Sequence, residues 1–388
     1  MGRGVSNTLL LIIMPERTSV LRRSLAVMTA CLGVLVAARS VRADAPAVEA
    51  AATRRPASLT LYALTQPYDG TRKSIGVATA PAGLPVTVTY NGDTALPVLP
   101  GRYDVVAAVA DGRYRGMVSA SLTITVTAFV RHAPQCDGEI NGSLELATPE
   151  SVTLTDSVAI SGDLLVPGSP SLLLAGLPMI ADSRDETGSP EPRDYSISLN
   201  GSSVLRCLVR RVQPPMMPSL AAPDLPATAR DVVVNSFTAT ASANAADRST
   251  VAAPVAPHLD GGTYRDVSVQ AGAELILGHA GATAPDVYAL RSLALHEGAS
   301  LQLAGPVVLV VSDGVDIKGD CNDPAHARWL TLAIAKGDLD LGPGATLSGL
   351  VLAPAGCVAI ANDAVLVGEI TSDTLLIDRT GLLAESAP

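Results

Sequence analysis

The C-terminal third of the chain repeats short aliphatic runs at nearly constant intervals. Leu339–Leu341 returns as Val358–Ile360, and the run that begins at Leu347 returns at Leu366, nineteen residues later in both cases. Leu375–Ile377 begins seventeen residues after Val358. A period of this size, with three short strands per period, is what one coil of a β-helix needs. The spacing therefore predicts a right-handed parallel β-helix-like solenoid, whose coils lie about 4.8 Å apart.

The composition favours the same fold class. Hydrophobic residues make up 48% of the 388-residue chain, yet aromatic residues make up only 3%, so Val, Leu, Ile and Ala must fill the interior. Small aliphatic side chains suit repetitive strand stacking better than a core built on large rings. The 33 Gly and 28 Pro indicate frequent turns and short elements. We therefore expect an all-β protein.

We assign residues 134–388 to the β-helix-like domain. Weaker aliphatic runs between residues 144 and 174 predict the opening coils of the same stack. Two interruptions are expected: a polar protruding loop at Asp182–Arg193, and a Pro-rich loop at 213–226 that packs along the outside.

The N-terminal segment has the pattern of an export signal. Arg17, Arg22 and Arg23 form a basic region before the apolar run Leu25–Ala37, and small residues favour cleavage after Ala43. Residues 1–43 are thus a predicted signal peptide, with Met1 and Met14 both open as the start, and residues 44–58 an Ala/Pro-rich spacer. No later apolar stretch reaches about 18 residues, so we expect no stable membrane span in the mature chain. The predicted location is the periplasm, the outer surface or the extracellular space.

Residues 59–128 alternate apolar and polar side chains with a period of two. The run Val86–Tyr90 alternates cleanly and ends on the turn pair Asn91-Gly92. Such runs, bounded by Gly, Pro, Asn and Asp, are typical of half-buried antiparallel strands joined by tight turns. About seventy residues suffice for one compact β-domain, so we expect a small β-sandwich or β-grasp-like module.

This module resembles the MBG-type β-modules of large bacterial surface proteins. The departure is Pro100-Gly101-Arg102, where that family more usually has Ala-Gly-Thr. The resemblance implies a spacer or adhesion unit and offers no catalytic residue. It is carried by Tyr68-Asp69-Gly70, VTVTYNG at 86–92, Gly101 with Tyr103, the run Asp104–Gly116 and SLTI at 121–124.

The segment Cys136–Leu383 resembles β-helical surface or secreted proteins of Gram-negative bacteria, a resemblance that carries no activity over to single residues. A more distant likeness is to ice-binding β-helices, through Ser348–Ile370, but the surrounding threonines, Thr331, Thr346, Thr371 and Thr374, do not recur at coil spacing. The resemblance rests on GDLLVPGSPSLLLAG at 162–176, RDYSISLNGSSVL at 193–205, LVRRVQPP at 208–215, GTYRDVSVQAGAELIL at 262–277, GPVVLVVSDGVDIKGD at 305–320 and WLTLAIAKGDLDL at 329–341.

Charge and cysteine content limit the partners and the chemistry. A net charge of -10 opposes a nucleic-acid partner, since phosphate binding needs a basic surface. Four cysteines remain after the predicted signal peptide: Cys136, Cys207, Cys321 and Cys357. An even number in an oxidising compartment permits two disulfide bridges with three connectivities, and small buried apolar residues are the alternative.

No catalytic, cofactor or metal site is predicted. The segment Asp320–His326 contains Asp, Cys and His, but its pattern is ordinary turn chemistry without a second ligand pair. Asp316 and Asp340 are expected to lie side by side on the outside of the coils. The five histidines are scattered, with no pair spaced for one strand face: His132, His258, His279, His296 and His326.

The sequence therefore favours an exported structural or adhesive cell-envelope or surface protein that is not an enzyme. Its expected partners are cell-envelope components or extracellular polysaccharide. The alternative is a secreted β-helix that binds or degrades polysaccharide. Such enzymes need converging carboxylates and aromatic rings that stack on sugars, and Trp329 is the only tryptophan.

Overall fold

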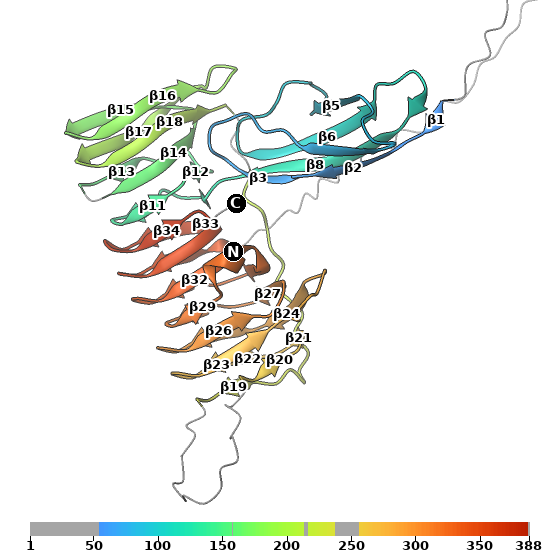
Figure 1. The fold of residues 1–388 in the computed structure, drawn as a ribbon. Coiled ribbons are helices and arrows are strands. Elements are labelled where there is room, and N and C mark those ends of the chain that lie inside the picture. The colour runs from blue at the N-terminus through green and yellow to red at the C-terminus, as the bar shows by residue number, and fades with distance from the viewer. Residues whose placement is uncertain (1–53, 157, 213–215, 237–255, 387–388) are drawn as a thin grey trace, which may run out of the picture. The chain divides into compact units, whose positions relative to one another are not determined.

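The computed structural model describes residues 54–386 except 157, 213–215 and 237–255. The predicted signal peptide and most of the spacer lie outside the described residues. The regular secondary structure of these residues is all β-strand apart from a short 3-10 helix at Pro324–Trp329, which confirms the all-β class (Figure 1). No helix in this part of the chain is long and apolar enough to cross a membrane.

The N-terminal module contains three sheets, of which the two larger share one core and the third is the short pair β1–β7. Strands β3, β8, β6 and β5 form a four-stranded sheet, and β2 pairs with β4. Val105 and Leu122 are fully buried between them, and Leu61 and Val77 of the smaller sheet pack against the same cluster. The strands are β1 (Arg55–Pro56), β2 (Ser58–Tyr62), β3 (Thr65–Pro67), β4 (Gly76–Ala80), β5 (Val86–Tyr90), β6 (Gly101–Val109), β7 (Tyr114–Arg115) and β8 (Met117–Thr125).

The strand directions in the module only partly follow the antiparallel expectation. The pairs β2–β4, β5–β6 and β6–β8 are antiparallel as predicted. The pairs β1–β7 and β3–β8 are parallel, so the antiparallel prediction is wrong there. The two strands of each of these pairs are far apart in the sequence and are not joined by a tight hairpin turn. Without such a turn, the local sequence does not fix whether the strands run parallel or antiparallel.

Beyond the module, parallel strands stack coil upon coil (Figure 1). A separate parallel sheet of β13 (Val152–Leu154), β17 (Pro192–Gly201) and β15 (Ser169–Gly176) lies beside the main one. The main sheet comprises β9 (Ala128–Val130), β10 (Gln135–Cys136), β11 (Glu139–Asn141), β12 (Leu144–Leu146), β14 (Ala159–Pro167), β16 (Met179–Asp185), β18 (Val204–Arg211), β19 (Val232–Val234), β20 (His258–Leu259), β21 (Gly262–Thr263), β22 (Asp266–Val269), β23 (Glu274–Leu277), β24 (Asp286–Leu290), β25 (Ser292–Leu295), β26 (Ser300–Leu303), β27 (Val307–Val311), β28 (Val315–Ile317), β29 (Asp320–Cys321), β30 (Leu330–Ile334), β31 (Leu339–Leu341), β32 (Thr346–Ile360), β33 (Val365–Ile377) and β34 (Leu382–Ala384).

The register of these strands confirms the predicted repeat. Leu339 is aligned with Val358, and Val358 with Leu375. Leu347 is likewise aligned with Leu366. All five side chains are fully buried, so each seats on its counterpart in the next coil. The aliphatic ladders inferred from the sequence therefore form the interior of the solenoid.

The order of the coils differs from the predicted order. Residues 128–146 do not begin the stack: β9 and β10 pair with β33, and β11 pairs with β34. The N-terminal coils thus continue the solenoid from its last C-terminal coil, where Ile370, Ala128, Leu144 and Leu164 form one ladder. Two coils can pair in parallel when an unpaired strand edge of one meets a strand edge of the other and their inward aliphatic side chains align. The two coils do not have to be neighbours in the sequence. The prediction of one shared stack holds, but its opening coils were misplaced.

The expected polar loop at Asp182–Arg193 is also smaller than predicted. Asp182–Asp185 belongs to β16 and Pro192 begins β17, which leaves only residues 186–191 as the connection. Most of β16 is solvent-exposed, so polar side chains are tolerated on it and hide the strand pattern. By contrast, residues 216–226 of the Pro-rich segment contain neither strand nor helix.

The module packs against the outside of the solenoid within one compact unit, Thr53–Pro388. Leu165 of β14 and Val209 of β18 belong to the module's core cluster, not to the solenoid interior. Their sequence neighbours Leu164 and Leu208 point inward and join the solenoid core. Both faces of these strands are therefore buried, one in each core.

We expect the interior ladders to dominate stability. Leu339→Ala should lower the free energy of unfolding by about 2–5 kcal/mol, because it leaves a cavity at a fully buried position. Leu177→Ala, at a position that is 86% exposed, is the matched control and should change it by less than about 0.5 kcal/mol. Urea unfolding followed by circular dichroism measures both, and equal effects would contradict the ladder as the main stabilising feature.

Candidate functional site

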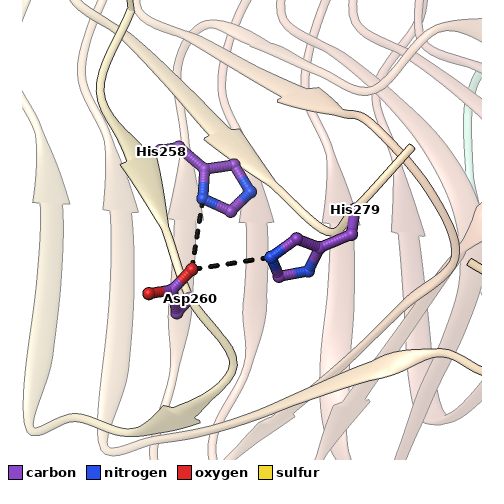
Figure 2. A group of neighbouring side chains, drawn as sticks. All are labelled: His258, Asp260 and His279. Atoms are coloured by element: carbon purple, nitrogen blue, oxygen red, sulfur yellow. Dashed lines mark ion pairs between the residues drawn. The ribbon is translucent and has the colours of Figure 1, made fainter.

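A group of three titratable side chains lies at one corner of the solenoid. His258 is in β20, Asp260 follows that strand, and His279 follows β23, the strand that pairs with β20 in the next coil. Figure 2 shows both imidazole rings directed at the Asp260 carboxylate. Asp260 Oδ1 lies 3.4 Å from His258 Nδ1 and 3.6 Å from His279 Nε2. Among the described residues, this is the group of three or more His, Cys, Asp or Glu side chains whose ligand atoms could meet at a metal ion.

The second nitrogen of each ring is engaged by another group. His258 Nε2 lies 2.6 Å from the carbonyl oxygen of Gly278, and His279 Nδ1 lies 2.6 Å from Asp286 Oδ2. A carbonyl and a carboxylate oxygen can only accept, so both of these ring nitrogens donate. The interaction with the Asp286 carboxylate raises the pKa of His279. These two hydrogen bonds therefore fix the orientation of both imidazole rings.

The backbone that carries the group is held by a buried tyrosine. The Tyr288 hydroxyl accepts a hydrogen bond from the Gly278 N–H at 3.0 Å and donates one to the Leu259 carbonyl at 2.8 Å. It thereby joins the segment of His258 and Asp260 to that of His279. Gly278 has φ +76°, and a Cβ there would lie 2.9 Å from the Gly305 carbonyl oxygen, so a glycine is needed at this corner.

The sequence analysis found no histidine pair spaced for one strand face, and His258 and His279 indeed lie on different coils. Their ring centroids are nevertheless 4.9 Å apart. They are 21 residues apart in the sequence, close to one coil. A search for ligand residues separated by one coil period, in place of a search along one strand, would have found the pair. The weak strand pattern before residue 274 hid that relation.

A buried carboxylate joins the module to the solenoid. Asp163 of β14 is fully buried and accepts hydrogen bonds from the Tyr68 hydroxyl at 2.8 Å, Arg184 at 2.8 Å and Arg206 Nε at 2.6 Å. Burial raises the pKa of Tyr68, and the Asp163 carboxylate raises it further. Tyr68 belongs to the Tyr-Asp-Gly turn that carries the MBG resemblance. This turn therefore makes the polar contact with the coils.

A second buried ion pair lies on the same side of the solenoid. Arg211 contacts Glu145, and both side chains are almost inaccessible to solvent. Arg211 also contacts Glu186 at 3.3 Å, so one guanidinium serves two carboxylates. Burial raises the pKa of Glu145 to about 7, against the lowering effect of Arg211.

The four cysteines are free thiols, so the two disulfide bridges that their number permits are absent from the structure. Cys321 occupies a ladder position between Leu301 and Leu347, and Cys136 is aligned with Ile377. Burial raises the pKa of Cys321 to about 12 and that of Cys136 to about 11. Cys207 joins the module core, and Cys357 is half-buried beside Thr374. Three of the four thiols are thus buried in a core, and Cys357 is not fully buried.

The segment Asp320–His326 is structured by turn contacts. The Asn322 side chain donates to the carbonyls of His326 and Ser348, and Asp323 caps Ala325. The His326 ring packs on Trp329, with centroids 4.1 Å apart.

Asp316 and Asp340 are aligned on neighbouring coils, as the sequence predicts. Lys318 Nζ lies 2.7 Å from Asp316 Oδ2. Partial burial and the neighbouring Asp316 charge raise the pKa of Asp340. A polysaccharide-cleaving enzyme requires converging carboxylates. This outward pair of acids with one lysine is one such grouping, and Glu369 and Glu385, which line a pocket together with Arg328, are another.

Comparison with known proteins identifies the module. Residues 57–128 match the family model of the MBG domain, which agrees with the resemblance in the sequence. No curated protein matches the chain. Among solved structures, the competence-associated pilin ComZ from Thermus thermophilus is similar at 12% identity over 72% of each chain, with a TM-score of 0.19. So low a score carries no argument about this chain.

We expect Asp163→Asn to destabilise the protein, because two arginines and a tyrosine lose a buried carboxylate. The loss in unfolding free energy should be about 3 kcal/mol, in the range for breaking a buried pair. Asp185→Asn, which weakens the exposed contact with Arg210, is the matched control and should cost less than about 1 kcal/mol. Chemical unfolding of the two variants tests this, and equal losses would contradict a role for Asp163 in holding the module.

The raised pKa of Glu145 predicts a pH dependence of stability. Between about pH 4.5 and 7 the folded state retains a proton that the unfolded state has released, so this group makes the free energy of unfolding fall as pH rises. The Glu145→Gln variant should lose this pH-dependent contribution to the free energy of unfolding, and its stability should be lower at every pH. Chemical unfolding of the parent chain and the variant at pH 5 and pH 7 measures the contribution. A variant whose stability changes with pH as much as that of the parent chain would contradict the prediction.

Proposed function

We propose that this protein is an exported structural or adhesive component of the bacterial cell envelope or surface, and that it has no catalytic activity. Its partners are cell-envelope components or extracellular polysaccharide. The proposal goes beyond the family match, which covers only residues 57–128. MBG domains are typical of surface proteins, and this module supports a role outside the cytoplasm.

The observation that carries the proposal is the joining of two cores through shared strands. Leu165 and Val209 fill the module core, while Leu164 and Leu208 on the same strands fill the solenoid core. A separable spacer would present a polar, hydrated boundary. Here the boundary is apolar, and it surrounds the buried Asp163 group. Such a connection favours a rigid element that bears or transmits load.

Export is tested by cell fractionation, with and without detergent, and by protease accessibility on intact cells. The parent chain should fractionate with the envelope or the medium, and Leu32→Arg should remain inside because it interrupts the predicted apolar signal region. Leu177→Ala, outside that region, should behave as the parent chain. A cytoplasmic location of the parent chain would contradict the proposal.

The absence of catalysis is tested on cell-wall and extracellular polysaccharides. The purified protein should release no reducing ends, because Asp316 and Asp340 lie beside each other on the coil exterior and Lys318 pairs with one of them. Asp316→Asn and Asp340→Asn should be indistinguishable from the parent chain. Release of sugars that either substitution abolishes would favour the polysaccharide-degrading alternative.

A further inference from the structure

The His258, Asp260 and His279 group poses an electrostatic problem. The hydrogen bonds to the Gly278 carbonyl and to Asp286 require protons on His258 Nε2 and His279 Nδ1. In the neutral rings, His258 Nδ1 and His279 Nε2 then carry lone pairs, and both face the Asp260 carboxylate at 3.4 and 3.6 Å. Three electron-rich atoms around one point repel one another unless a metal ion lies between them or a ring takes up a second proton and donates it to Asp260.

We propose that His258, Asp260 and His279 bind one divalent transition-metal ion of the zinc class, which links two successive coils of the solenoid. Two imidazole nitrogens and a carboxylate oxygen are a ligand set that zinc accepts, with water completing the coordination. Imidazole ligands disfavour calcium and magnesium, which prefer oxygen. The inference does not depend on where the protein resides.

The separations between the atoms fit such an ion. Two ligand atoms bound about 2.0–2.1 Å from a tetrahedral ion lie about 3.3 Å apart. The two contacts of Asp260 Oδ1, at 3.4 and 3.6 Å, are close to this value, and all three ligand atoms lie within 4.8 Å of one another. Small side-chain rotations would close the remaining gap. The corner is solvent-exposed, so the ion can enter without opening the fold.

The surroundings of the ligands support binding over a simple ion pair. Metal-binding histidines almost always donate their second ring N–H to a carbonyl or a carboxylate, which fixes the ring and its tautomer. Gly278 supplies that carbonyl for His258, and Asp286 supplies that carboxylate for His279. Tyr288 then bridges the two backbone segments from within the core. An exposed ion pair has no need of this second set of contacts.

The ion would act as a cross-link between coils. Its ligands come from β20 and from the corner after β23, which are parallel neighbours with only two aligned residue pairs. Short strands at this position contribute few ladder hydrogen bonds. A bound ion adds bonds between the same two coils, and it stabilises the folded state by an amount that grows with the logarithm of its free concentration above the dissociation constant.

The test is titration of the purified, tag-free chain with zinc in isothermal calorimetry, and with cobalt in visible spectroscopy. We expect one zinc per chain, a cobalt spectrum with the intense bands of tetrahedral coordination, and a thermal midpoint that rises with zinc. Calcium and magnesium should not compete. His258→Ala and His279→Ala should abolish the cobalt bands, and Asp286→Asn should weaken zinc binding by about tenfold through loss of ring orientation.

The matched control is His296→Ala. His296 is an exposed histidine of the neighbouring coil whose Nε2 contacts only the Ser268 hydroxyl among the contacts described, at 3.2 Å. This variant should bind zinc and cobalt as the parent chain does. Circular dichroism must show that each variant folds, and Asp286→Asn keeps all three ligands should an alanine variant fail. No binding by the folded parent chain, binding unchanged in His258→Ala and His279→Ala, or equal loss in His296→Ala would each overturn the proposal.

Discussion

The structure depends on the seating of one aliphatic side chain upon its counterpart in the next coil. Leu339, Val358 and Leu375 are separated along the chain by one coil each and are fully buried in one ladder. Parallel strands satisfy their backbone hydrogen bonds through neighbouring coils, so the ladder supplies the apolar burial and the sheet supplies the polar pairing. Few aromatic residues are needed, because each ladder position is a small, repeated space.

The same constraint explains the order of the coils. A coil end exposes unpaired strand edges, and any coil with matching aliphatic positions can cover them. Residues 128–146 cover the edges of β33 and β34 and continue the solenoid from the C-terminal coil. The segment that enters from the module thus lies in the middle of the stack. The module therefore lies against the outer faces of β14 and β18. There Asp163 accepts hydrogen bonds from Tyr68 of the module and from Arg184 and Arg206 of the solenoid.

The buried polar groups and the surface group have different roles. Asp163 and Glu145 are buried carboxylates held by arginines at the contact between module and solenoid, so a carboxylate that lost its partner would not be hydrated. The histidine group lies in solvent, where an ion pair alone contributes little. Its two histidines contact Asp260 through one ring nitrogen and Gly278 or Asp286 through the other, so both rings are oriented toward one carboxylate.

Local periodicity determined the all-β class, the parallel ladders from Leu339 to Ile377 and the adjacency of Asp316 and Asp340, because coil spacing and strand alternation are properties of neighbouring residues. The MBG module was also visible in its own turns and alternating runs. Only the tertiary structure decided that residues 128–146 follow the C-terminal coil, and that β1–β7 and β3–β8 are parallel. It alone brought His258 to His279 and Tyr68 to Asp163. The coil order, the parallel pairs and the contact of Tyr68 depend on which free edge each segment meets, and no spacing along the chain encodes that choice. The contact of His258 with His279 follows the coil period, but the strand pattern around them was too weak to reveal it.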